Sequence, residues 1–542
     1  MKKKLLVLGV LTGAFLASCS PAAPKQYRFN VECTNCSVNL ESSLSIDVDE
    51  NEYVTLKLLP KEGYLLPTDV KITSGNQVLI KNVDYIYTVN ENRLSGEVTV
   101  KATKALDINV EADEQGYLYI GNNKIGKSGD YSTLDYMHYI GKKEKGNIVY
   151  DFESNTLYLN QATLVAEKIG LHEFKANIDD EEVVLKGMIG WTGGGTLNIK
   201  MSNDNYFVCD TEDEEDSIFV CPSEGGVLNI EGSSAVTFAD ADVSIIMNMR
   251  GKTEINSVYF ESSDLSDYGI YSKELEINNS DINLFNGLAV MSGSVGIYAN
   301  NATVKDSYCR IEGFDCGAIV TVLNLIDTCM DVKGLDTGLY IDWLNAYGHR
   351  TDSGYSTVIS AYGEGFGIST YDVMHFSGCD VRATCDEGYA ITTVDTTINL
   401  IDSSLTAYAN VGEAVHAFML NFVNSNVEAE VGEGVAIRTS IHGAQDIGRE
   451  FEPVMKFINS NIYAKGDVAI CGFGHLEEQD CTDVPKHLEA LVDERHELYL
   501  WSFVADSETE LKYEGAIDPA TGQPFFSPTN GLSVVEIHAA NL

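Results

Sequence analysis

The chain has 542 residues and a formal net charge of −45, because 81 acidic side chains outnumber 36 basic ones. Nucleic acids and anionic membrane surfaces are bound by basic patches, so this balance excludes both as general partners. It is compatible with neutral glycans, cationic partners, and acidic glycans bridged by a divalent cation, and it also keeps a protein hydrated and monomeric.

Residues 1–19 predict a bacterial lipoprotein signal. Three lysines near the start precede an apolar stretch at 5–17, which is shorter than the roughly 20 residues of a membrane-spanning helix. The sequence Leu16-Ala-Ser-Cys19 resembles the lipobox, in which the cysteine is lipidated and becomes the mature N-terminus. We therefore expect lipidation of Cys19, a spacer at residues 20–25, and an exported protein that contacts the cell membrane only through this anchor and faces the extracellular side.

Residues 26–106 predict a small β-sandwich, since short alternating runs are separated by turn residues about every 8 to 12 positions. Gly63-Tyr-Leu-Leu-Pro67, with the strand-like runs 85–89 and 94–100, resembles the bacterial repeat-type β modules of cell-surface proteins. That resemblance implies a stalk or spacer. Cys33-Thr-Asn-Cys36 lacks the second ligand pair of a closed zinc site, so no metal is expected here.

Residues 107–149 predict a linker that leads into a solenoid, and residues 150–470 predict the solenoid itself. Its repeated phrase is two alternating apolar residues, a small polar anchor, and a further apolar residue two places on. The clearest copy is Leu275-Glu-Ile-Asn-Asn-Ser-Asp-Ile282, with Ser280 as its anchor. The anchors recur at intervals of about 21 to 35 residues, which is typical of stacked repeats and not of a globular enzyme fold. The other anchors are Ser202, Ser233, Ser307, Thr328, Cys379, Ser403, Ser425 and Ser460, with degenerate copies at Ser257 and Ser356.

Each repeat has room for three short strands and sharp turns within about 22 residues, the size of one coil of a parallel β-helix. A leucine-rich repeat has a similar length but needs a helical or Leu-rich convex segment, which is missing, so the β-helix is favoured. Alternation directs Leu275 and Ile277 inward. Cys309 shares an inward position with Met330 and Val381, which predicts that it acts as an apolar filler. The Asn or Asp before an anchor is expected to satisfy backbone groups of the turn.

Two outward columns on the strand after the anchor are candidates for binding. One contains Arg310, Asp331 and Arg382, together with Ile359 in this alignment, and the other contains Asp281, Tyr308, Cys329, Thr357 and Asp380. Polysaccharide lyases on β-helices place acidic Ca²⁺ ligands and a basic residue on such a face. Asp331 and Asp380 are therefore candidate metal ligands, and Arg310 and Arg382 are candidate glycan contacts or bases. Two carboxylates clustered beside a base are not evident, and stacked opposite charges can equally form surface ladders.

The longest insertion within the repeats, residues 338–355, carries Tyr340, Trp343 and Tyr347. Aromatic rings on a loop stack well on sugar faces, so these three residues are candidate glycan contacts. The alternative is that the rings pack back onto the coil. The acidic run 210–216 lacks the ligand spacing and the Gly of an EF-hand loop, and we interpret it as a solvated loop.

Residues 471–542 predict a C-terminal cap, because the end of a solenoid exposes apolar side chains and unpaired strand edges. Within it, residues 485–498 predict a helix, with apolar side chains on one face. Without Cys19 the cysteines are odd in number, which does not indicate a disulfide framework. Cys471, His475 and Cys481 lack the regular spacing of structural zinc sites.

The lipobox, the repeat-type module, the segment 150–159 and the Leu-x-Ile-x-x-Ser-x-Ile coils together resemble a family of carbohydrate-binding surface lipoproteins, related in fold to polysaccharide lyases. The resemblance implies an all-β protein with a small N-terminal β-sandwich, a right-handed single-stranded parallel β-helix and a cap. It implies a protein that binds plant-type or acidic polysaccharide without cleaving it and that can use Ca²⁺. No cofactor is expected to be required, and the acidic surface favours a monomer. Two alternatives stay open, a β-helix polysaccharide lyase or glycoside hydrolase and a structural adhesin that binds a protein.

Overall fold

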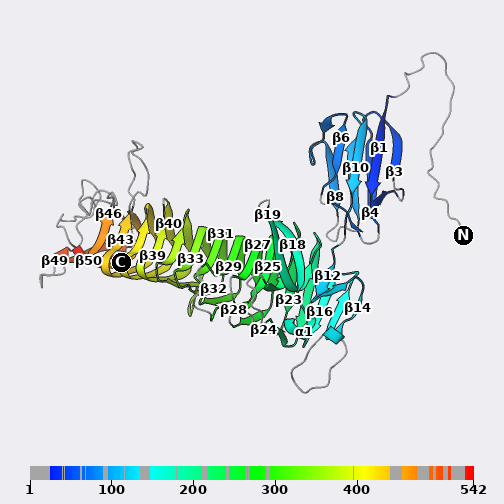
Figure 1. Cartoon of the computed structure of the whole chain (residues 1–542). Helices are drawn as coiled ribbons and strands as arrows, with labels where there is room; N and C mark the ends of the chain where they lie inside the picture. The colour runs from blue at the N-terminus through cyan, green and yellow to red at the C-terminus, as the bar shows by residue number, and fades with distance from the viewer. Residues whose placement is uncertain are drawn as a thin grey trace, which may run out of the picture. The chain divides into compact units, whose positions relative to one another are not determined.

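The computed structural model divides the chain into two compact units, Met1–Gln115 and Gly116–Leu542, and each is described by itself (Figure 1). The structure describes residues 25–134 and 147–439, except 40, 42, 62–63, 68, 90–94, 115, 179–180, 210–215, 240–242, 264, 266–267, 288–292 and 395, and then residues 455–472, 488–491, 496–504, 511–513 and 532–541. Within these residues helix is confined to α1 (Ala166–Ile169) and the 3-10 turn η1 (Ser132–Leu134). The predicted all-β class is confirmed.

The first unit contains two sheets that share one hydrophobic core. One has the strand order β3-β1-β10-β6-β7 and the other β2-β4-β9-β8, while β5 and β11 form a separate pair. The strands are β1 (Gln26–Thr34), β2 (Cys36–Val38), β3 (Ser43–Asp49), β4 (Tyr53–Pro60), β5 (Tyr64–Leu65), β6 (Lys71–Ser74), β7 (Gln77–Val78), β8 (Tyr85–Val89), β9 (Gly96–Lys101), β10 (Leu106–Glu111) and β11 (Asp113–Glu114). Alternation along the strands places Phe29 and Val31 of one sheet in the same core as Leu56 and Val98 of the other.

The strand pairing of the first unit extends past residue 106, where the sequence places its end. Strand β10 pairs in parallel with β1, from Phe29 opposite Leu106 to Thr34 opposite Glu111. Residues 107–111 therefore form part of a sheet of the first unit and do not form a linker.

The second unit starts with a mixed set of strands and continues as a regular stack. The first strands are β12 (Leu118–Ile120), β13 (Asn123–Ile125), β14 (Gly129–Asp130), β15 (Ile148–Asp151), β16 (Thr156–Asn160), β17 (Thr163–Val165), β18 (His172–Ile178), β19 (Glu181–Trp191), β20 (Thr196–Ser202), β21 (Asn205–Val208), β22 (Asp216–Val220), β23 (Val227–Gly232) and β24 (Ala235–Ala239). Strands β18 and β19 form an antiparallel hairpin, whereas β19 pairs in parallel with β22 and β20 with β23.

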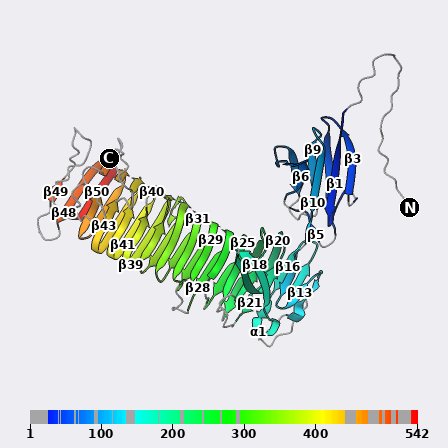
Figure 2. The ribbon, with the colours of Figure 1, turned by 45° about the horizontal axis from the view of Figure 1, so that its top comes forward.

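The stack then continues coil by coil toward the C-terminus. Its strands are β25 (Ser244–Asn256), β26 (Tyr259–Ser262), β27 (Tyr268–Asn278), β28 (Asp281–Phe285), β29 (Val295–Lys305), β30 (Tyr308–Glu312), β31 (Cys316–Ile326), β32 (Cys329–Lys333), β33 (Thr337–Tyr347), β36 (Thr357–Gly363), β37 (Phe366–Thr370), β38 (Met374–Ser377), β39 (Cys379–Thr393), β40 (Thr397–Ile401), β41 (Ser404–Ala417), β42 (Met419–Val423), β43 (Asn426–Thr439), β44 (Met455–Ile458), β45 (Asn461–Lys465) and β46 (Val468–Gly472). Each strand pairs in parallel with the equivalent strand of the next coil, and Figure 2 shows the resulting stack. This large, mostly parallel sheet is compatible with a β-helix solenoid.

One coil shows how the chain forms three faces. In β27 the alternation of buried and exposed residues breaks at Lys273 and Glu274, which are both exposed and mark a corner. We call the face made by the first halves of β27, β29, β31 and β33 the first face. The second halves of the same strands make the second face. Strands β28, β30, β32 and β36 make the third face. Buried side chains of successive coils lie in register, and Cys309 pairs with Met330 and Met330 with Ile359 in the core. The prediction that Cys309 fills an inward position is confirmed.

The anchor hydroxyls form a buried hydrogen-bonded ladder where the second face bends into the third. The Ser425 hydroxyl donates to the carbonyl of Val423 at 2.7 Å and accepts the backbone N–H of Ser403 at 3.2 Å. The N–H of Ser425 in turn donates to the Ser460 hydroxyl at 3.1 Å. Each anchor therefore closes its own turn and also satisfies a buried donor of the neighbouring coil.

The residue before most anchors adopts a left-handed backbone conformation. Its φ angle lies between 47° and 50° at Asn279, Asp306, Asp327, Asp402, Asn424 and Asn459. Among non-glycine residues Asn and Asp tolerate this region best, because their short polar side chains can bond locally. Their predicted place in the turn is confirmed. The Asn424 amide donates to the Asp402 side chain at 2.9 Å and the Asn459 amide to the Asn424 side chain at 3.2 Å, so these contacts join neighbouring coils and do not reach backbone groups of the turn.

At the two degenerate repeats the predicted anchor is wrong by one residue. Thr357, and not Ser356, occupies the ladder, since its hydroxyl donates to the carbonyl of Tyr347 at 2.6 Å. In the other copy Ser257 has a φ of 56° and takes the turn position before the anchor. The outward column of Asp331 and Arg382 therefore contains Ser360 in place of the buried Ile359.

Two further expectations are corrected by strand pairing. Most of the expected insertion 338–355 is strand β33, and only residues 348–356 leave the stack, as a hairpin with strands β34 (Arg350–Thr351) and β35 (Gly354–Tyr355). The helix expected at 485–498 is replaced, where the chain is described, by β47 (Leu488–Leu491) and the start of β48 (His496–Val504). Strand β47 pairs in parallel with β44.

Antiparallel strands follow the last coil. Strand β50 (Leu532–Asn541) pairs antiparallel with β45 and with β48, and β49 (Leu511–Tyr513) pairs with β48. Val535 and Ile537 of β50 are buried in the core of the stack. The edge of β45 is therefore occupied by a strand and not by a helix.

Replacing an anchor hydroxyl should destabilise the second unit. In Ser403→Ala the buried N–H of Cys379, which donates to the Ser403 hydroxyl at 3.0 Å, loses its partner. We expect a loss of about 1–3 kcal/mol, measured as the change in the free energy of urea unfolding. The matched control is Ser404→Ala, which removes the half-exposed hydroxyl next in sequence and should change stability by less than about 0.5 kcal/mol. Equal effects of the two substitutions would contradict the ladder.

Candidate functional site

An open groove with a volume of about 830 Å³ follows the bend between the second and third faces. Its size lies within the roughly 300–1,000 Å³ of ligand pockets. We call it the bend groove. Its lining residues come from six successive coils, and they are Ser233, Ser257, Val258, Tyr259, Asn279, Ser280, Asp281, Asp306, Ser307, Tyr308, Asp327, Cys329 and Ser356. At the spacing of paired strands the groove extends about 24 Å along the stack, so it suits an elongated ligand.

One wall of the bend groove is the column of turn residues. Asn279, Asp306 and Asp327 occupy the left-handed position of three successive coils, and this places their polar side chains one above the other. The Asn279 amide donates to the Ser257 hydroxyl at 3.1 Å. Lys305 lies 3.9 Å from the Asp306 carboxylate. The bend that every coil requires therefore supplies a row of amide and carboxylate groups.

The other wall is the first outward column of the third face. Tyr259, Asp281, Tyr308 and Cys329 are register partners in four successive coils. Phenol rings thus flank a carboxylate, and Asn283 donates to the Asp281 carboxylate at 3.1 Å. Burial raises the pKa of Asp281, whereas the Asn283 hydrogen bond lowers it. Burial also raises the pKa of Tyr259 and Tyr308, so both phenols stay protonated and can donate hydrogen bonds.

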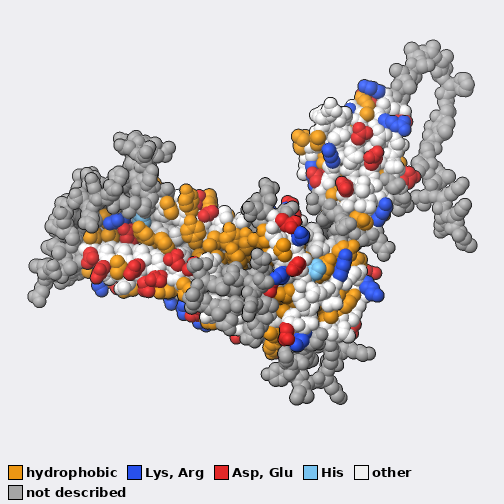
Figure 3. Space-filling view, in the orientation of Figure 1, with side chains coloured by type: hydrophobic (Ala, Val, Ile, Leu, Met, Phe, Trp, Pro, Cys, Tyr) orange, Lys and Arg blue, Asp and Glu red, His pale blue; other side chains and the backbone are white. Residues whose placement is uncertain are grey.

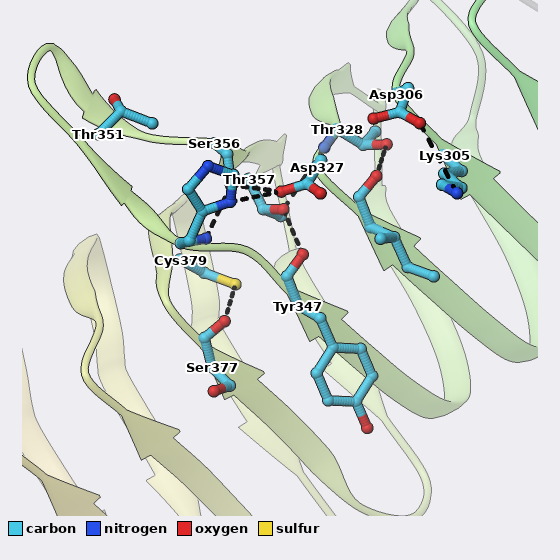
Figure 4. Close-up of polar contacts among 12 residues, drawn as sticks. Lys305, Asp306, Asp327, Thr328, Tyr347, Thr351, Ser356, Thr357, Ser377 and Cys379 are labelled. Atoms are coloured by element: carbon cyan, nitrogen blue, oxygen red, sulfur yellow. Dashed lines mark hydrogen bonds and ion pairs between the residues drawn. The ribbon is translucent and has the colours of Figure 1, made fainter.

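Asp327 and Ser356, at one end of the bend groove, form a hydrogen-bonded group with His349. Figure 4 shows the contact between Ser356 and Asp327. The Ser356 hydroxyl donates to Asp327 Oδ1 at 2.6 Å, and His349 Nδ1 lies 3.0 Å from the same oxygen and 3.0 Å from the hydroxyl. In a catalytic triad the imidazole contacts the serine and the carboxylate through opposite nitrogens. Here one nitrogen faces both groups, so the arrangement fastens the hairpin to the stack and does not activate the serine.

The side chains that line the bend groove carry a net negative charge. Its lining residues include three aspartates and no lysine, arginine or histidine. Within the described residues no group of three or more His, Cys, Asp or Glu side chains could hold a metal ion. The groove thus offers hydrogen-bond acceptors and aromatic rings but neither a basic residue nor a formed metal site.

The candidate ionic residues lie on the third face, and most of them are paired there. Arg310 bonds Glu312 at 2.8 Å, and Arg382 bonds Asp380 at 2.8 Å on its own strand. Both contacts join residues two positions apart on one strand, so they are surface ion pairs within a coil and not the charge ladders between coils that were the alternative. Asp331 and Asp380 occupy different columns, two coils apart. Two coils correspond to about 10 Å, so the structure does not bring these two carboxylates to one site.

The candidate aromatic residues lie on strand β33 and outside the bend groove. Tyr340, Trp343 and Tyr347 are 45%, 47% and 44% exposed, so they neither project from a loop nor pack fully against the coil. Tyr340 continues an outward column of the first face that contains Tyr271 and Tyr298, whose ring centroids are 4.5 Å apart. Figure 3 shows apolar side chains gathered over these coils. This aromatic column is separate from the charged candidates.

Several features of the site were not recognisable as functional in the sequence. Five residues that line the groove illustrate this. Asp281, Tyr308 and Cys329 belong to an outward column that the sequence identifies as a candidate for binding, whereas the sequence assigns Asp306 and Asp327 only to turns. Asp306 and Tyr308 combine an acidic turn residue with a tyrosine two positions later, but the neighbouring coils do not repeat this combination, so it gives no repeated sequence signal.

A second polar cluster is buried near the C-terminal end of the first face. Glu413 pairs with Arg438 at 2.9 Å, and the Tyr389 ring stacks on His416 at a centroid distance of 5.1 Å. Thr392 lies 3.3 Å from His416 Nδ1. Glu413 Oε2 and Arg438 Nε have no hydrogen-bond partner in the described part of the chain. Burial raises the pKa of Glu413 to about 7, and Arg438 opposes the shift.

The segments that carry the localisation predictions are only partly visible. Cys19 and the lipoprotein signal lie outside the described residues. No helix among the described residues is both long enough and apolar enough to cross a membrane. Cys471 is disulfide-bonded, which leaves it no thiolate for zinc, while His475 and Cys481 lie outside the described residues.

Comparison with known proteins adds no further constraint. No protein-family model, curated protein or solved structure matches the chain. Its function is therefore argued from the groove and the side chains described above.

The buried cluster predicts a stability that falls as pH rises. Because the folded state raises the pKa of Glu413 from 4.5 to about 7, the associated stability is fully present below pH 4.5 and is lost as pH passes through 7. Between pH 5 and pH 8 the wild type should lose about 2–3 kcal/mol relative to Glu413→Gln, as measured by urea unfolding at these two pH values. The control is Glu433→Gln, which changes an exposed carboxylate of the next coil. A stability difference between wild type and Glu413→Gln that is the same at both pH values would disprove this effect.

Proposed function

We propose that the protein is a tethered cell-surface protein that binds a polysaccharide along the bend groove without cleaving it. The observation that carries this proposal is the composition of the groove, which spans six successive coils and carries tyrosines or aspartates in the four middle ones. An extended sugar chain presents hydroxyl groups and apolar ring faces at regular intervals. The regular coil spacing presents acceptors and aromatic rings in the same way.

The proposed contacts follow from the two walls. Carboxylates of Asp306 and Asp327 accept hydrogen bonds from sugar hydroxyls, and such bonds to charged acceptors are stronger than neutral ones. Tyr308 is 36% exposed, so its ring can stack on a sugar face while its phenol donates a hydrogen bond. The rigid stack holds these groups in place before binding, which reduces the entropy cost of recognition.

Charge favours a neutral polysaccharide over an acidic one. The three aspartates of the groove would repel a polyuronate, and the described residues contain no cluster that could hold a bridging Ca²⁺. Among the glycans expected from the sequence, a neutral plant-type polysaccharide is therefore the better ligand. Binding to it requires no cofactor.

The same composition speaks against a lyase. β-Elimination needs a general base near the scissile sugar, and the lining residues include no lysine, arginine or histidine. Burial raises the pKa of Tyr259 and Tyr308, which disfavours their phenolates, and the nearby Lys305 pairs with Asp306. A glycoside hydrolase would use two of the aspartates as acid and base or nucleophile. A structural adhesin would bind protein and leave the groove without a sugar ligand. Both alternatives are outcomes of the experiment below.

We further propose the finer architecture that the sequence predicts. The second unit is a right-handed single-stranded parallel β-helix that ends in a cap, and the parallel strand pairing supports this proposal. The first unit is a β-sandwich of the repeat type that acts as a spacer, supported by its two sheets and common core. Lipidation of Cys19 tethers the protein to the outer side of the cell membrane as a monomer.

Native affinity electrophoresis tests the proposed groove. The protein is run in gels that contain a neutral β-glucan, xylan or polygalacturonate, with and without chelator. We expect retardation by a neutral polysaccharide that is unaffected by chelator. Tyr308→Ala removes the stacking ring and should weaken the affinity about tenfold, which corresponds to about 1.4 kcal/mol. Asp306→Asn keeps the left-handed turn, removes the charge and should weaken it severalfold.

Two matched substitutions outside the groove serve as controls. Tyr408→Ala removes a 42% exposed tyrosine of β41, and Asp402→Asn changes the equivalent turn residue of a coil beyond the groove. Neither should alter retardation. Equal loss in all four variants, or none in any, would refute the groove as the binding site. New reducing ends in the incubated polysaccharide would establish a hydrolase, and unsaturated-product absorbance a lyase.

A further inference from the structure

A smaller pocket lies farther along the third face, next to a strand that follows the last coil. The first halves of β39, β41 and β43, and then β45, continue this face by parallel pairing. The pocket has a volume of about 140 Å³, and its lining residues come from β41, β43, β45 and β50. Figure 2 shows β50 at this end of the stack. The volume equals that of about five water molecules of roughly 30 Å³ each, so it suits one small ring and not a chain. We call it the terminal pocket.

Differences in side-chain length along two outward columns create the hollow. Ser404 and Thr406 of β41 present short hydroxyl side chains on the outer surface of the coil. Their register partners in β43 are the longer Asn426 and Glu428. The two hydroxyls therefore lie lower than the amide and the carboxylate beside them, and together the four side chains form a floor and a wall.

Strand β50 adds a second boundary to the terminal pocket. Strand β45 continues the two columns with Asn461 and Tyr463, and β50 pairs antiparallel with β45. The backbone N–H of Ala539 donates to Asn461 Oδ1 at 2.9 Å, which fixes β50 against the column. His538 of β50 thereby lines the pocket. The pocket thus depends on the strand that pairs with the edge of the last coil.

The polar groups of the terminal pocket include both donors and acceptors. The Asn461 amide donates to Asn426 Oδ1 at 2.8 Å, so the oxygen of Asn426 is used while its two N–H bonds have no partner within the described residues. Glu428 is exposed and forms no ion pair in the described part of the chain, so its oxygens can accept hydrogen bonds. The hydroxyls of Ser404 and Thr406 can donate or accept. Sugar hydroxyls also do both, so this mixture matches a polyol.

Tyr463 supplies the apolar surface of the terminal pocket. Its ring is half-buried, and aromatic faces stack on the C–H groups of sugar rings. Burial raises the pKa of Tyr463, and the carboxylates of Glu430, Glu536 and Glu428 raise it further, so the phenol stays protonated and can donate a hydrogen bond. The lining residues include one carboxylate and no lysine or arginine, which disfavours an anionic sugar.

We propose that the terminal pocket is a second binding site, which takes a single neutral pyranose ring. The Glu428 carboxylate accepts hydrogen bonds from two adjacent sugar hydroxyls, the Asn426 amide donates to a sugar oxygen, and the ring packs on Tyr463. The proposal rests on the proposed function for its class of ligand but not on the bend groove. A site for one ring recognises a free sugar or the end of a glycan chain, whereas the bend groove suits the interior of a chain.

Ligand-detected NMR of the full chain tests the terminal pocket. Methyl glycosides of glucose, galactose, mannose and xylose are titrated separately, and we expect at least one of them to bind in the millimolar range. Glu428→Gln removes the charged acceptor with little change of shape and should weaken binding about tenfold. Thr406→Phe fills the hollow from its floor with a residue that strands accept well, and it should abolish binding.

Matched variants outside the terminal pocket serve as controls. Glu433→Gln changes another exposed carboxylate of β43, and Thr384→Phe enlarges a half-buried outward threonine of β39. Neither should alter binding of the glycosides. Tyr308→Ala, in the bend groove, should also leave it unchanged, while Thr406→Phe should retain gel retardation by polysaccharide. The two assays therefore report failure of the two sites separately.

The outcomes decide the proposal. Loss of glycoside binding in Glu428→Gln and Thr406→Phe, with binding kept in both controls, establishes the site. No binding of any glycoside to wild type, or equal binding to wild type and Thr406→Phe, overturns it. Binding of glucosamine but of no neutral glycoside would identify a cation site and would also overturn it. If Thr406→Phe does not fold, the comparison of Glu428→Gln with Glu433→Gln decides the question.

Discussion

The buried anchor side chain, a hydroxyl at most bends and a thiol at Cys379, makes the contact on which the second unit depends. Ser425 shows the arrangement. Its hydroxyl donates to the carbonyl of Val423 and accepts the N–H of Ser403, and its backbone N–H donates to the Ser460 hydroxyl. A sharp bend inside a core would otherwise bury unpaired backbone groups, each costing about 1–3 kcal/mol. Because part of the hydrogen bonding at each bend comes from the next coil, a single coil cannot be stable alone. The inward side chains are needed for the core, so binding groups must be among the outward side chains.

The same constraint produces the bend groove. The residue before the anchor must accept a left-handed conformation, which glycine, asparagine and aspartate do at least cost. Where Asn279, Asp306 and Asp327 meet this requirement, a polar row results. Gly378 meets it with a φ of 67° in a later coil, where an added Cβ would lie 2.3 Å from the carbonyl oxygen of Gly348. Glycine satisfies the bend but offers no side chain, so the polar row is interrupted near the hairpin and resumes at Asp402.

Much of the coil could be predicted from the sequence, because Leu275, Ile277 and Ile282 record the inward alternation directly. The anchor was predicted at Ser356 because two adjacent residues with hydroxyls, Ser356 and Thr357, fit the pattern. They are distinguished by the hydrogen bond of Ser356 to Asp327, a residue distant in sequence. The helical spacing of residues 485–498 was overridden at β47 by pairing with β44. The groove itself was less predictable from the sequence. It forms where the column of turn residues lies beside the first outward column of the third face, and this arrangement depends on how the coils stack.

The pairing of carboxylates distinguishes the groove from the rest of the third face. Beyond it, Glu312 and Asp380 are neutralised by arginines of their own strands. Within it, Asp281 and Asp327 accept hydrogen bonds from Asn283 and Ser356, and in the described chain no lysine or arginine pairs with either. Asp306 is the exception, since Lys305 lies 3.9 Å from its carboxylate. An aspartate row held at coil spacing repels itself unless hydroxyl donors solvate it. Sugar hydroxyls can replace water there without adding charge, so the acidity of the groove is a reason for neutral-glycan binding and not an obstacle to it.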